Sequence, residues 1–177
     1  KMLENSDAKT VINEITQTHT QICLDADNFG TCAHTMRYGL YEGFVTGSQD
    51  GQPVAPLMGQ FQDYDGGAGD FQMGPLSFML NYPDHCVLYR FLPRSLTESD
   101  IELVWFVRGD AVEGKDYDLE KLTWLWHHTT LEDEYIITRN SLGVNSRFFE
   151  PGPYHSEFEE TLQQFIHWYL HTLSEVV

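Results

Sequence analysis

Basic residues are scarce in this chain. Its 177 residues include 10 Lys and Arg against 27 Asp and Glu, which gives a net charge of −17 with His neutral. Proteins that bind nucleic acids or anionic membranes need clustered Lys and Arg to contact phosphates, and none cluster here. The composition therefore argues against both kinds of partner and favours solubility or the attraction of a basic partner.

Long apolar runs and paired cysteines are also missing. No segment reaches the roughly 18 apolar residues of a membrane-spanning helix, and no signal-peptide pattern is present. Cys23, Cys32 and Cys86 form no C-x-x-C pair, so the sequence predicts reduced thiols in a cytoplasmic chain. Because the first residue is Lys1 rather than Met, we expect either processing or a piece of a longer polypeptide.

The remaining composition is typical of one folded domain over residues 1–177. Hydrophobic residues make up 41% and aromatic residues 14% of the chain, enough to form a core. Residues 1–35 are polar and weakly periodic, which predicts an irregular lead-in. β-forming runs at 36–47, 73–81, 85–93 and 101–108, joined by short links, predict an antiparallel sheet over 36–110. The glycine-rich run at 62–70 predicts a flexible loop.

Two helices are expected after the sheet. Asp118 can cap a helix over 118–142, and Ser156-x-x-Glu159 is a capping box that opens another over 156–175. The second helix carries an apolar stripe, and we expect that stripe to lie across the concave side of the sheet. Its members are Phe158, Leu162, Phe165, Ile166, Tyr169 and Leu173. The prediction is an α+β helix-grip fold, START-like, with an antiparallel sheet wrapped around a long C-terminal helix and a cavity between them.

Asp133 is the first candidate for chemistry. On a helix it shares one face with mostly apolar neighbours, so we expect its carboxylate to point inward. These neighbours are Trp126, Thr129, Ile136, Ile137 and Asn140. An inward carboxylate is costly unless it is paired or binds a metal. The structural alternative is a hydrogen bond to Thr129 or to a nearby Arg such as Arg139.

Candidate ligand-binding residues are fewer. His85, at the start of a strand, is a candidate for facing the cavity, although a turn histidine bonded to local backbone is the alternative. The aromatic side chains of Tyr82, Phe106 and Trp126 can line an apolar pocket or form part of the core. The i, i+4 pair His167 and His171 could bind a metal, but it lies on a polar helix face. Nucleophile-elbow, phosphate-loop and dinucleotide motifs are absent from the sequence.

Several segments resemble one enzyme family. "GSQDGQPVAPLMG", "YPDHCVLYRFLP", "DAVEGKDYD" and, most specifically, "GVNSRFFEPGPY" resemble the catalytic domain of the α subunit of Rieske non-haem iron oxygenases. The resemblance extends over about residues 36–173 and points to the branch that includes glycine betaine and carnitine oxygenases and many ring hydroxylases.

The resemblance implies a helix-grip domain that binds one Fe(II) through two His and one carboxylate. Asp133 stands where the family has that carboxylate. It also implies hydroxylation of a small aromatic or quaternary-amine substrate by O₂, with electrons from NAD(P)H delivered by a reductase or ferredoxin. Relatives of this kind carry a 2Fe-2S Rieske cluster and form homotrimers.

The sequence departs from this family in two respects. "KMLEN" resembles the start of the segment that carries the two iron-binding histidines, but no such histidines follow, and no Rieske cluster domain is present. We therefore expect this chain alone to be inactive. Two other hypotheses remain open: a non-enzymatic helix-grip domain that binds a small molecule without iron, and a subunit that serves assembly only.

Overall fold

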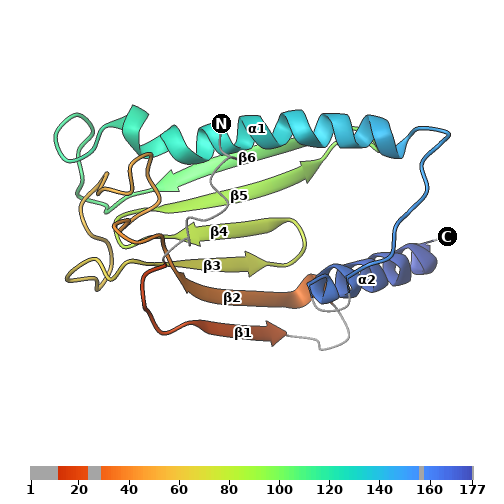
Figure 1. Ribbon diagram of the computed structural model, residues 1–177, viewed down its shortest axis with the longest axis horizontal. Coiled ribbons are helices and arrows are strands. Elements are labelled where there is room, and N and C mark those ends of the chain that lie inside the picture. Colours follow the sequence, from red (N-terminus) through yellow and green to blue (C-terminus); the bar gives the residue numbers. More distant parts are fainter. Residues whose placement is uncertain (1–11, 24–28, 156–157, 177) are drawn as a thin grey trace, which may run out of the picture.

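The computed structural model describes residues 12–23, 29–155 and 158–176. These residues form an α+β fold, as expected, with an antiparallel sheet and two α-helices (Figure 1). The strands are β1 (Thr18–Cys23), β2 (Cys32–Gly39), β3 (Gly67–Met73), β4 (Ser77–Asn81), β5 (Cys86–Pro93) and β6 (Ser99–Phe106). The helices are the short 3-10 helix η1 (Phe29–Thr31), α1 (Leu119–Val144) and the C-terminal α2 (Glu160–Val176).

The six strands follow the sequence across the sheet, in the order β1-β2-β3-β4-β5-β6. Because directly opposed residues of antiparallel strands point to the same side, the register defines one apolar face. We call it the inner face; it carries Tyr38, Leu80, Val87, Tyr89 and Trp105. Trp126 of α1 packs against this face, so the core lies between α1 and the centre of the sheet.

The sheet begins earlier than the sequence predicts. Residues 18–35, expected within an irregular lead-in, contain β1, η1 and the first part of β2. The apolar residues of this segment have mixed spacings, but β1 pairs along its whole length with β2, from Thr18 opposite Arg37 to Cys23 opposite Cys32. The strands of this segment form because they pair with neighbouring strands, and the pattern of apolar residues within the segment does not reveal that pairing.

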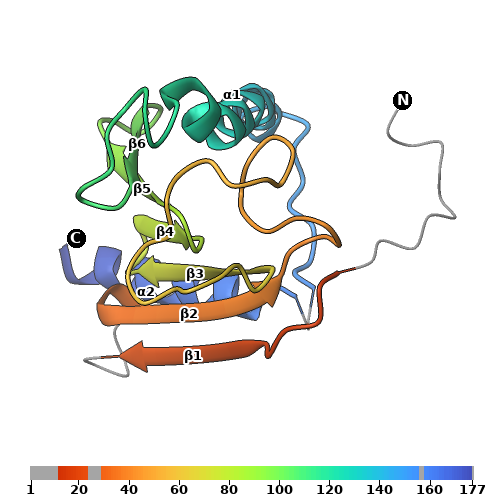
Figure 2. The same cartoon turned by 90° about the vertical axis from the view of Figure 1, so that its left-hand side faces the viewer.

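The strand expected at 36–47 ends at Gly39, and the glycine-rich stretch expected as a loop forms most of β3. A Cβ at Gly39 would lie 2.2 Å from the carbonyl oxygen of Asn13, so glycine permits a close crossing of the chain there. Leu40 then bonds to Gly66 through its backbone, and residues 40–66 form a long loop between β2 and β3. This loop runs beside the sheet towards the start of α1 (Figure 2).

Helix α1 begins as the sequence predicts and ends two residues later than expected. The Asp118 carboxylate accepts a hydrogen bond of 3.0 Å from the backbone N–H of Lys121. Only the first half of the helix packs on the sheet, and residues 131–144 are exposed. Among the described residues no helix is both long and apolar enough to cross a bilayer.

The C-terminal helix covers less of the sheet than expected. Helix α2 packs near η1 at one end of the sheet, and it is shorter than α1. Its apolar stripe is only partly covered: Phe165 and Ile166 are half-buried, whereas Leu162, Tyr169 and Leu173 are exposed. Ser156 of the expected capping box lies outside the described residues, and the carboxylate of Glu159 accepts instead from the backbone N–H of His155.

The cysteines also differ from expectation. Cys32 is buried and disulfide-bonded, and Cys86 is a free thiol. The prediction of three reduced thiols is therefore wrong. The spacing in sequence gives no sign of this, because the hairpin of β1 and β2 is what brings Cys23 and Cys32 into register.

Candidate functional site

A cavity of about 720 Å³ opens on the inner face of the sheet, over β1 to β4. The register places its strand residues side by side, with Met36 opposite Asp70 and Asp70 opposite Leu80. The polar side chains that line it are His19, His34, Thr35, Asp70 and Gln72. Its apolar lining comes from Met36, Phe78 and Leu80 and from Phe158, which precedes α2. A concave, mostly apolar space with a few polar groups is the usual form of a small-molecule site.

An aromatic wall separates this cavity from α1. The ring of Phe78 stacks on Tyr89 at 4.6 Å and on Phe91 at 5.9 Å between ring centroids. The Tyr89 hydroxyl lies 2.9 Å from the Thr130 hydroxyl on α1. Burial, followed by the nearby charge of Asp133, raises the pKa of the Tyr89 phenol. Through the contacts of Phe78 with Tyr89 and of Tyr89 with Thr130, this wall connects the cavity lining to the helix that carries Asp133.

Asp133 does not lie on a buried helix face. It follows Trp126 and Thr130 along α1, both of which approach the sheet, but Asp133 itself is exposed. The expectation of an inward, buried carboxylate is thus wrong, because α1 leaves the sheet at this point. The expected structural bond is also absent from the described residues: the Arg139 guanidinium lies over the Tyr135 ring at 4.4 Å instead.

The described residues do not assemble the metal site that the resemblance implies. Within residues 12–23, 29–155 and 158–176, no three His, Cys, Asp or Glu side chains come close enough to bind one ion together. Non-haem iron of this type needs two His and a carboxylate, and the described part of the chain offers Asp133 without them. The pair His167 and His171 is exposed on α2, and His171 lies 3.8 Å from Glu175.

A buried polar cluster lies where β4 turns into β5. Asp84 and His85 are both fully buried, with His85 Nδ1 2.8 Å from Asp84 Oδ1. The carboxylate also accepts from the Thr46 hydroxyl at 2.5 Å and from the backbone N–H of Val54 at 3.0 Å. Burial alone would raise the pKa of Asp84, but the hydrogen bonds from His85, Thr46 and Val54 together lower it. The turn thereby anchors the 40–66 loop.

Three of the four predicted ligand-binding residues come together. Tyr82 stacks on His85 at 4.8 Å and on Trp126 at 6.5 Å between ring centroids. His85 Nε2 and Trp126 Nε1 are buried without a hydrogen-bond partner in the described part of the chain. Phe106 lies apart from them. Its neighbour Trp105 is opposite Val87 on the inner face, so Phe106 points to the other face, where it is 43% exposed.

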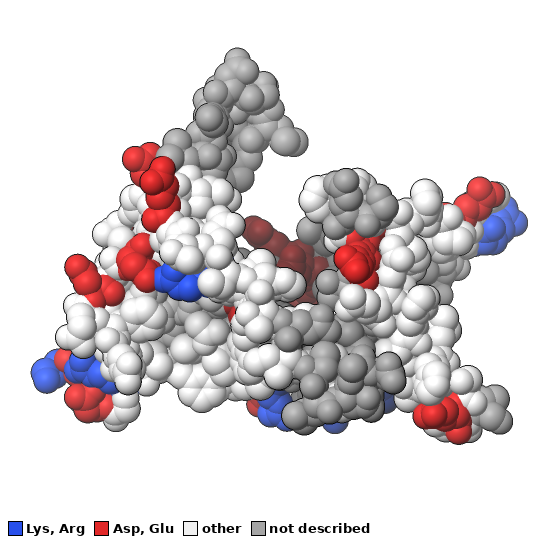
Figure 3. Space-filling view, turned by 90° about the horizontal axis from the view of Figure 1, so that it is seen from below, with Lys and Arg blue, Asp and Glu red and all other residues white. Residues whose placement is uncertain are grey.

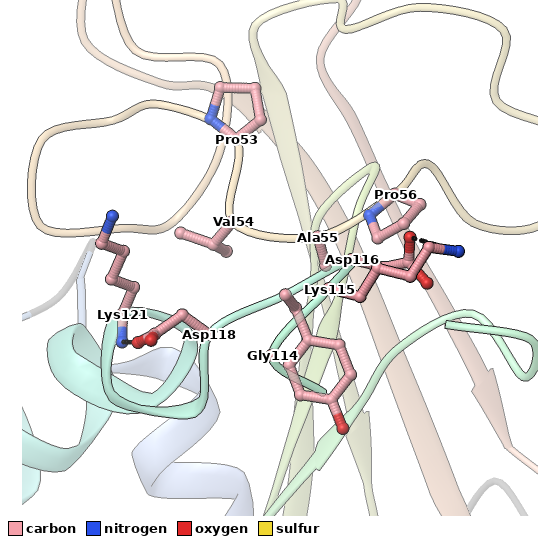
Figure 4. A pocket seen from close by; sticks show the side chains of 10 residues that line it. Pro53, Val54, Ala55, Pro56, Gly114, Lys115, Asp116, Asp118 and Lys121 are labelled. Carbon is pink, nitrogen blue, oxygen red and sulfur yellow. Dashed lines mark hydrogen bonds and ion pairs between the residues drawn. The ribbon is translucent and has the colours of Figure 1, made fainter. Parts of the chain in front are cut away.

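A second cavity lies between residues 53–56, in the middle of the 40–66 loop, and the start of α1 (Figure 4). It measures about 500 Å³, and both lysines of the described residues, Lys115 and Lys121, line it. Two carboxylates offset them: Asp118 caps α1, and Asp116 accepts from the backbone N–H of Val112 and pairs with Lys115 at 3.8 Å. Both carboxylates of this cavity are therefore engaged in local bonds at the capped start of α1.

Sequence reasoning missed the residues that line the main cavity. Asp70 is part of a glycine-rich run that reads as a loop, and His19 and His34 stand alone in the sequence. They come together only through the pairing of β1, β2 and β3. Alternation of side chains along β3 was the available signal, since Asp70 and Gln72 share one face.

Comparison with known proteins identifies the family. The family described as "Ring hydroxylating alpha subunit (catalytic domain)" matches residues 13–175, which is nearly the whole chain. The match includes both the inner-face cavity and α1.

Curated relatives agree with this match. The chain is 34% identical over 146 residues to the glycine betaine monooxygenase oxygenase subunit of Chromohalobacter salexigens, which is 82% of this chain and 33% of that protein. The protein of the same description from Pseudomonas aeruginosa is 33% identical over 143 residues, 80% of this chain and 33% of its own length. The chain thus spans about a third of the length of the curated relatives that it matches.

Proposed function

The chain belongs to the family of ring-hydroxylating alpha subunits, within their catalytic domain, and from this premise we propose that it forms the substrate-binding part of an oxygenase. The substrate is a small organic molecule with an apolar body, of the quaternary-amine or aromatic class. The reaction is hydroxylation by O₂ with electrons that derive from NAD(P)H.

The observation that carries this proposal is the cavity on the inner face and its aromatic wall. Phe78 and Leu80 line the cavity, and Phe78 stacks on Tyr89, which contacts α1 through Thr130. Asp133 stands one turn of α1 beyond Thr130, on the helix that the family uses for its metal carboxylate. A substrate in the cavity and a group bound near Asp133 would then share one face of the sheet.

The chain's own residues have three tasks in this proposal. The wall around Phe78 and Tyr89 binds the apolar body of the substrate and excludes water from it. Tyr82, His85 and Trp126 form a second buried group, which orients α1 against the sheet and contributes substrate contacts. Phe106, on the other face, contributes to substrate binding only if the substrate reaches the edge of β6.

Other components complete the activity in this proposal. Fe(II) at a mononuclear site would supply the activation of O₂, and Asp133 would be its carboxylate ligand. The described residues alone do not assemble such a site. The family also suggests three further components for the complete enzyme. These are a Rieske 2Fe-2S cluster, a reductase or ferredoxin that donates electrons, and assembly as a homotrimer.

A substitution of Asp133 tests the proposal. In the protein purified as its own gene encodes it, supplied with NADH, a reductase, O₂ and candidate substrates, Asp133→Ala should lower O₂-dependent substrate loss by about a hundredfold or more. The fold should be unchanged, since exposed positions usually alter stability by no more than about 0.5 kcal/mol. Mass spectrometry measures the substrate, and Glu132→Ala, an exposed neighbour on the same helix, is the matched control.

One observation favours a second candidate, a domain that binds a small molecule without iron. It is the absence of a three-residue metal cluster from the described residues. This candidate predicts a ligand in the cavity, equal binding by the wild-type and Asp133→Ala proteins, and no turnover. Turnover that survives Asp133→Ala would refute the role of Asp133. A protein that binds no small molecule at all would refute both candidates.

A further inference from the structure

Among the residues that the structure describes, no Lys or Arg pairs with the carboxylate of Asp70. Its carboxylate is half-buried in the wall of the inner-face cavity, where it accepts one hydrogen bond, of 3.0 Å, from the Tyr38 hydroxyl. The nearby arginine of β2, Arg37, pairs with Asp65 instead. Burial raises the pKa of Asp70, and the bond from Tyr38 offsets this only in part. A carboxylate in such a place is stabilised by a positive ligand.

The apolar side of the cavity suits a ligand with bulky, weakly hydrated substituents. Leu80 lies directly opposite Asp70 in the sheet, and Phe78 is its neighbour on the same face of β4. The Phe78 ring belongs to a stack with Tyr89 and Phe91, which holds it in place. Aromatic faces attract alkylammonium groups, and the attraction grows when the cation leaves water.

The described lining of the cavity lacks the permanently charged side chains that bind anions. Lys and Arg are absent from the described lining. Two histidines, His19 and His34, also line the cavity, and burial, followed by the nearby charge of His19, lowers the pKa of His34. A carboxylate entering the cavity would therefore meet the charge of Asp70 without a Lys or Arg to offset it.

From these contacts we infer that Asp70 determines the specificity of the cavity, and that its ligand is a small organic cation with a net positive charge rather than a zwitterion. The inference rests on the proposed function, since it assigns the substrate class of the same cavity. It goes beyond the relatives, whose printed substrate, glycine betaine, carries a carboxylate beside its quaternary ammonium group.

Titration calorimetry with three probes of similar shape tests the inference. Choline is the cation, 3,3-dimethylbutan-1-ol is its uncharged counterpart, and glycine betaine is the zwitterion. With the full chain at pH 8 and low salt, choline should bind about tenfold more tightly than either of the others. Asp70→Asn, which keeps the size of the side chain, should reduce this preference to less than about twofold. Asp100→Asn, which removes an exposed carboxylate paired with Arg94, should leave the preference unchanged.

The outcomes separate this inference from the proposed function. If glycine betaine binds as tightly as choline, or if Asp70→Asn retains the preference for choline, the role of Asp70 is refuted while the cavity remains a binding site. If none of the probes and no aromatic acid binds, the cavity itself is refuted as a substrate site. The comparison of choline with its uncharged counterpart needs only the wild-type chain, so it decides the question even if Asp70→Asn does not fold.

Discussion

At the scale of single residues, the Asp84 side chain ties three segments of the chain together. It is fully buried and bonds to the neighbouring His85, to Thr46 thirty-eight residues earlier and to the backbone of Val54. A buried carboxylate is tolerated only when such bonds replace water. The 40–66 loop has no helix or strand of its own, so these bonds, together with those from the Asn13 side chain to Tyr41, Phe44 and Gly66, fix it beside the sheet.

We expect Asp84→Asn to lower the free energy of unfolding at pH 7 by about 2–3 kcal/mol, because the amide leaves buried donors without an equivalent acceptor. Urea denaturation measures this change. The wild-type pKa of Asp84 is lower in the folded than in the unfolded state, so the unfolded chain binds more protons as the pH falls. The stabilisation is therefore present above the ordinary Asp pKa of about 4 and is lost as the pH falls through the folded value. Equal loss of stability below pH 5 in wild type and variant would contradict this role.

The two aspartates of the candidate site show what the sequence reveals at this scale. Asp133 could be singled out because its helical neighbours are mostly apolar, yet the same pattern wrongly predicted burial: the neighbours that follow it, Ile136, Ile137 and Asn140, are themselves exposed. Asp70 was missed, because the glycines that precede it in the sequence favour a loop. A helical pattern is local, whereas the place of Asp70 depends on pairing with β2 and β4.

At the scale of elements, the 40–66 loop packs so closely on the turn after β4 that there is no room for a side chain at Gly47. A Cβ at Gly47 would lie 2.2 Å from Tyr82 Cζ. The Tyr82 ring is itself held between its contacts with His85 and Trp126, so it has little freedom to withdraw. This one glycine therefore allows the loop to approach the sheet.

We expect Gly47→Ala to destabilise the chain by about 1–3 kcal/mol, the usual cost of overpacking a core. It should also change the tryptophan fluorescence, because the displaced Tyr82 ring contacts Trp126. Gly109→Ala is the matched control, since a Cβ there meets no atom within 4 Å. If both variants unfold at the same urea concentration as wild type, the loop does not press on Tyr82.

The elements themselves were predictable where the signals are local. The cap at Asp118, the strands β5 and β6 and both helices follow from capping residues and from runs of β-forming residues. The hairpin of β1 and β2 and the start of β3 could not be predicted from such local signals, because their residues become strands only when paired. The cover provided by α2 was overestimated, since an apolar stripe predicts that a helix face is buried but not which surface buries it.

At the scale of the whole molecule, acidic side chains outnumber basic ones, 27 against 10. They are spread over the face shown in Figure 3, whereas basic side chains form only a few isolated groups there. With a net charge of −17, the chain should attract positively charged proteins from a distance. This agrees with a basic electron-transfer partner in the proposed function.

We expect the chain to associate with a basic electron carrier such as cytochrome c much faster than with an acidic protein of similar size. Because exposed charges are screened by salt, the association rate should fall about tenfold or more between 10 mM and 150 mM ionic strength. Stopped-flow mixing measures the rate. A rate that does not depend on salt would show that the surface charge does not guide partners.

The order of the strands bears on how the protein forms during synthesis. Each strand pairs only with its neighbours in the chain, and none must wait for a distant segment. Each hairpin can therefore close soon after its second strand has left the ribosome, because the loop entropy to be overcome is small. The longest interval falls between β2 and β3, and Asp84, which helps to fix that loop, emerges after β4. Translation up to the β4–β5 turn is thus the point at which the loop can settle against the growing sheet.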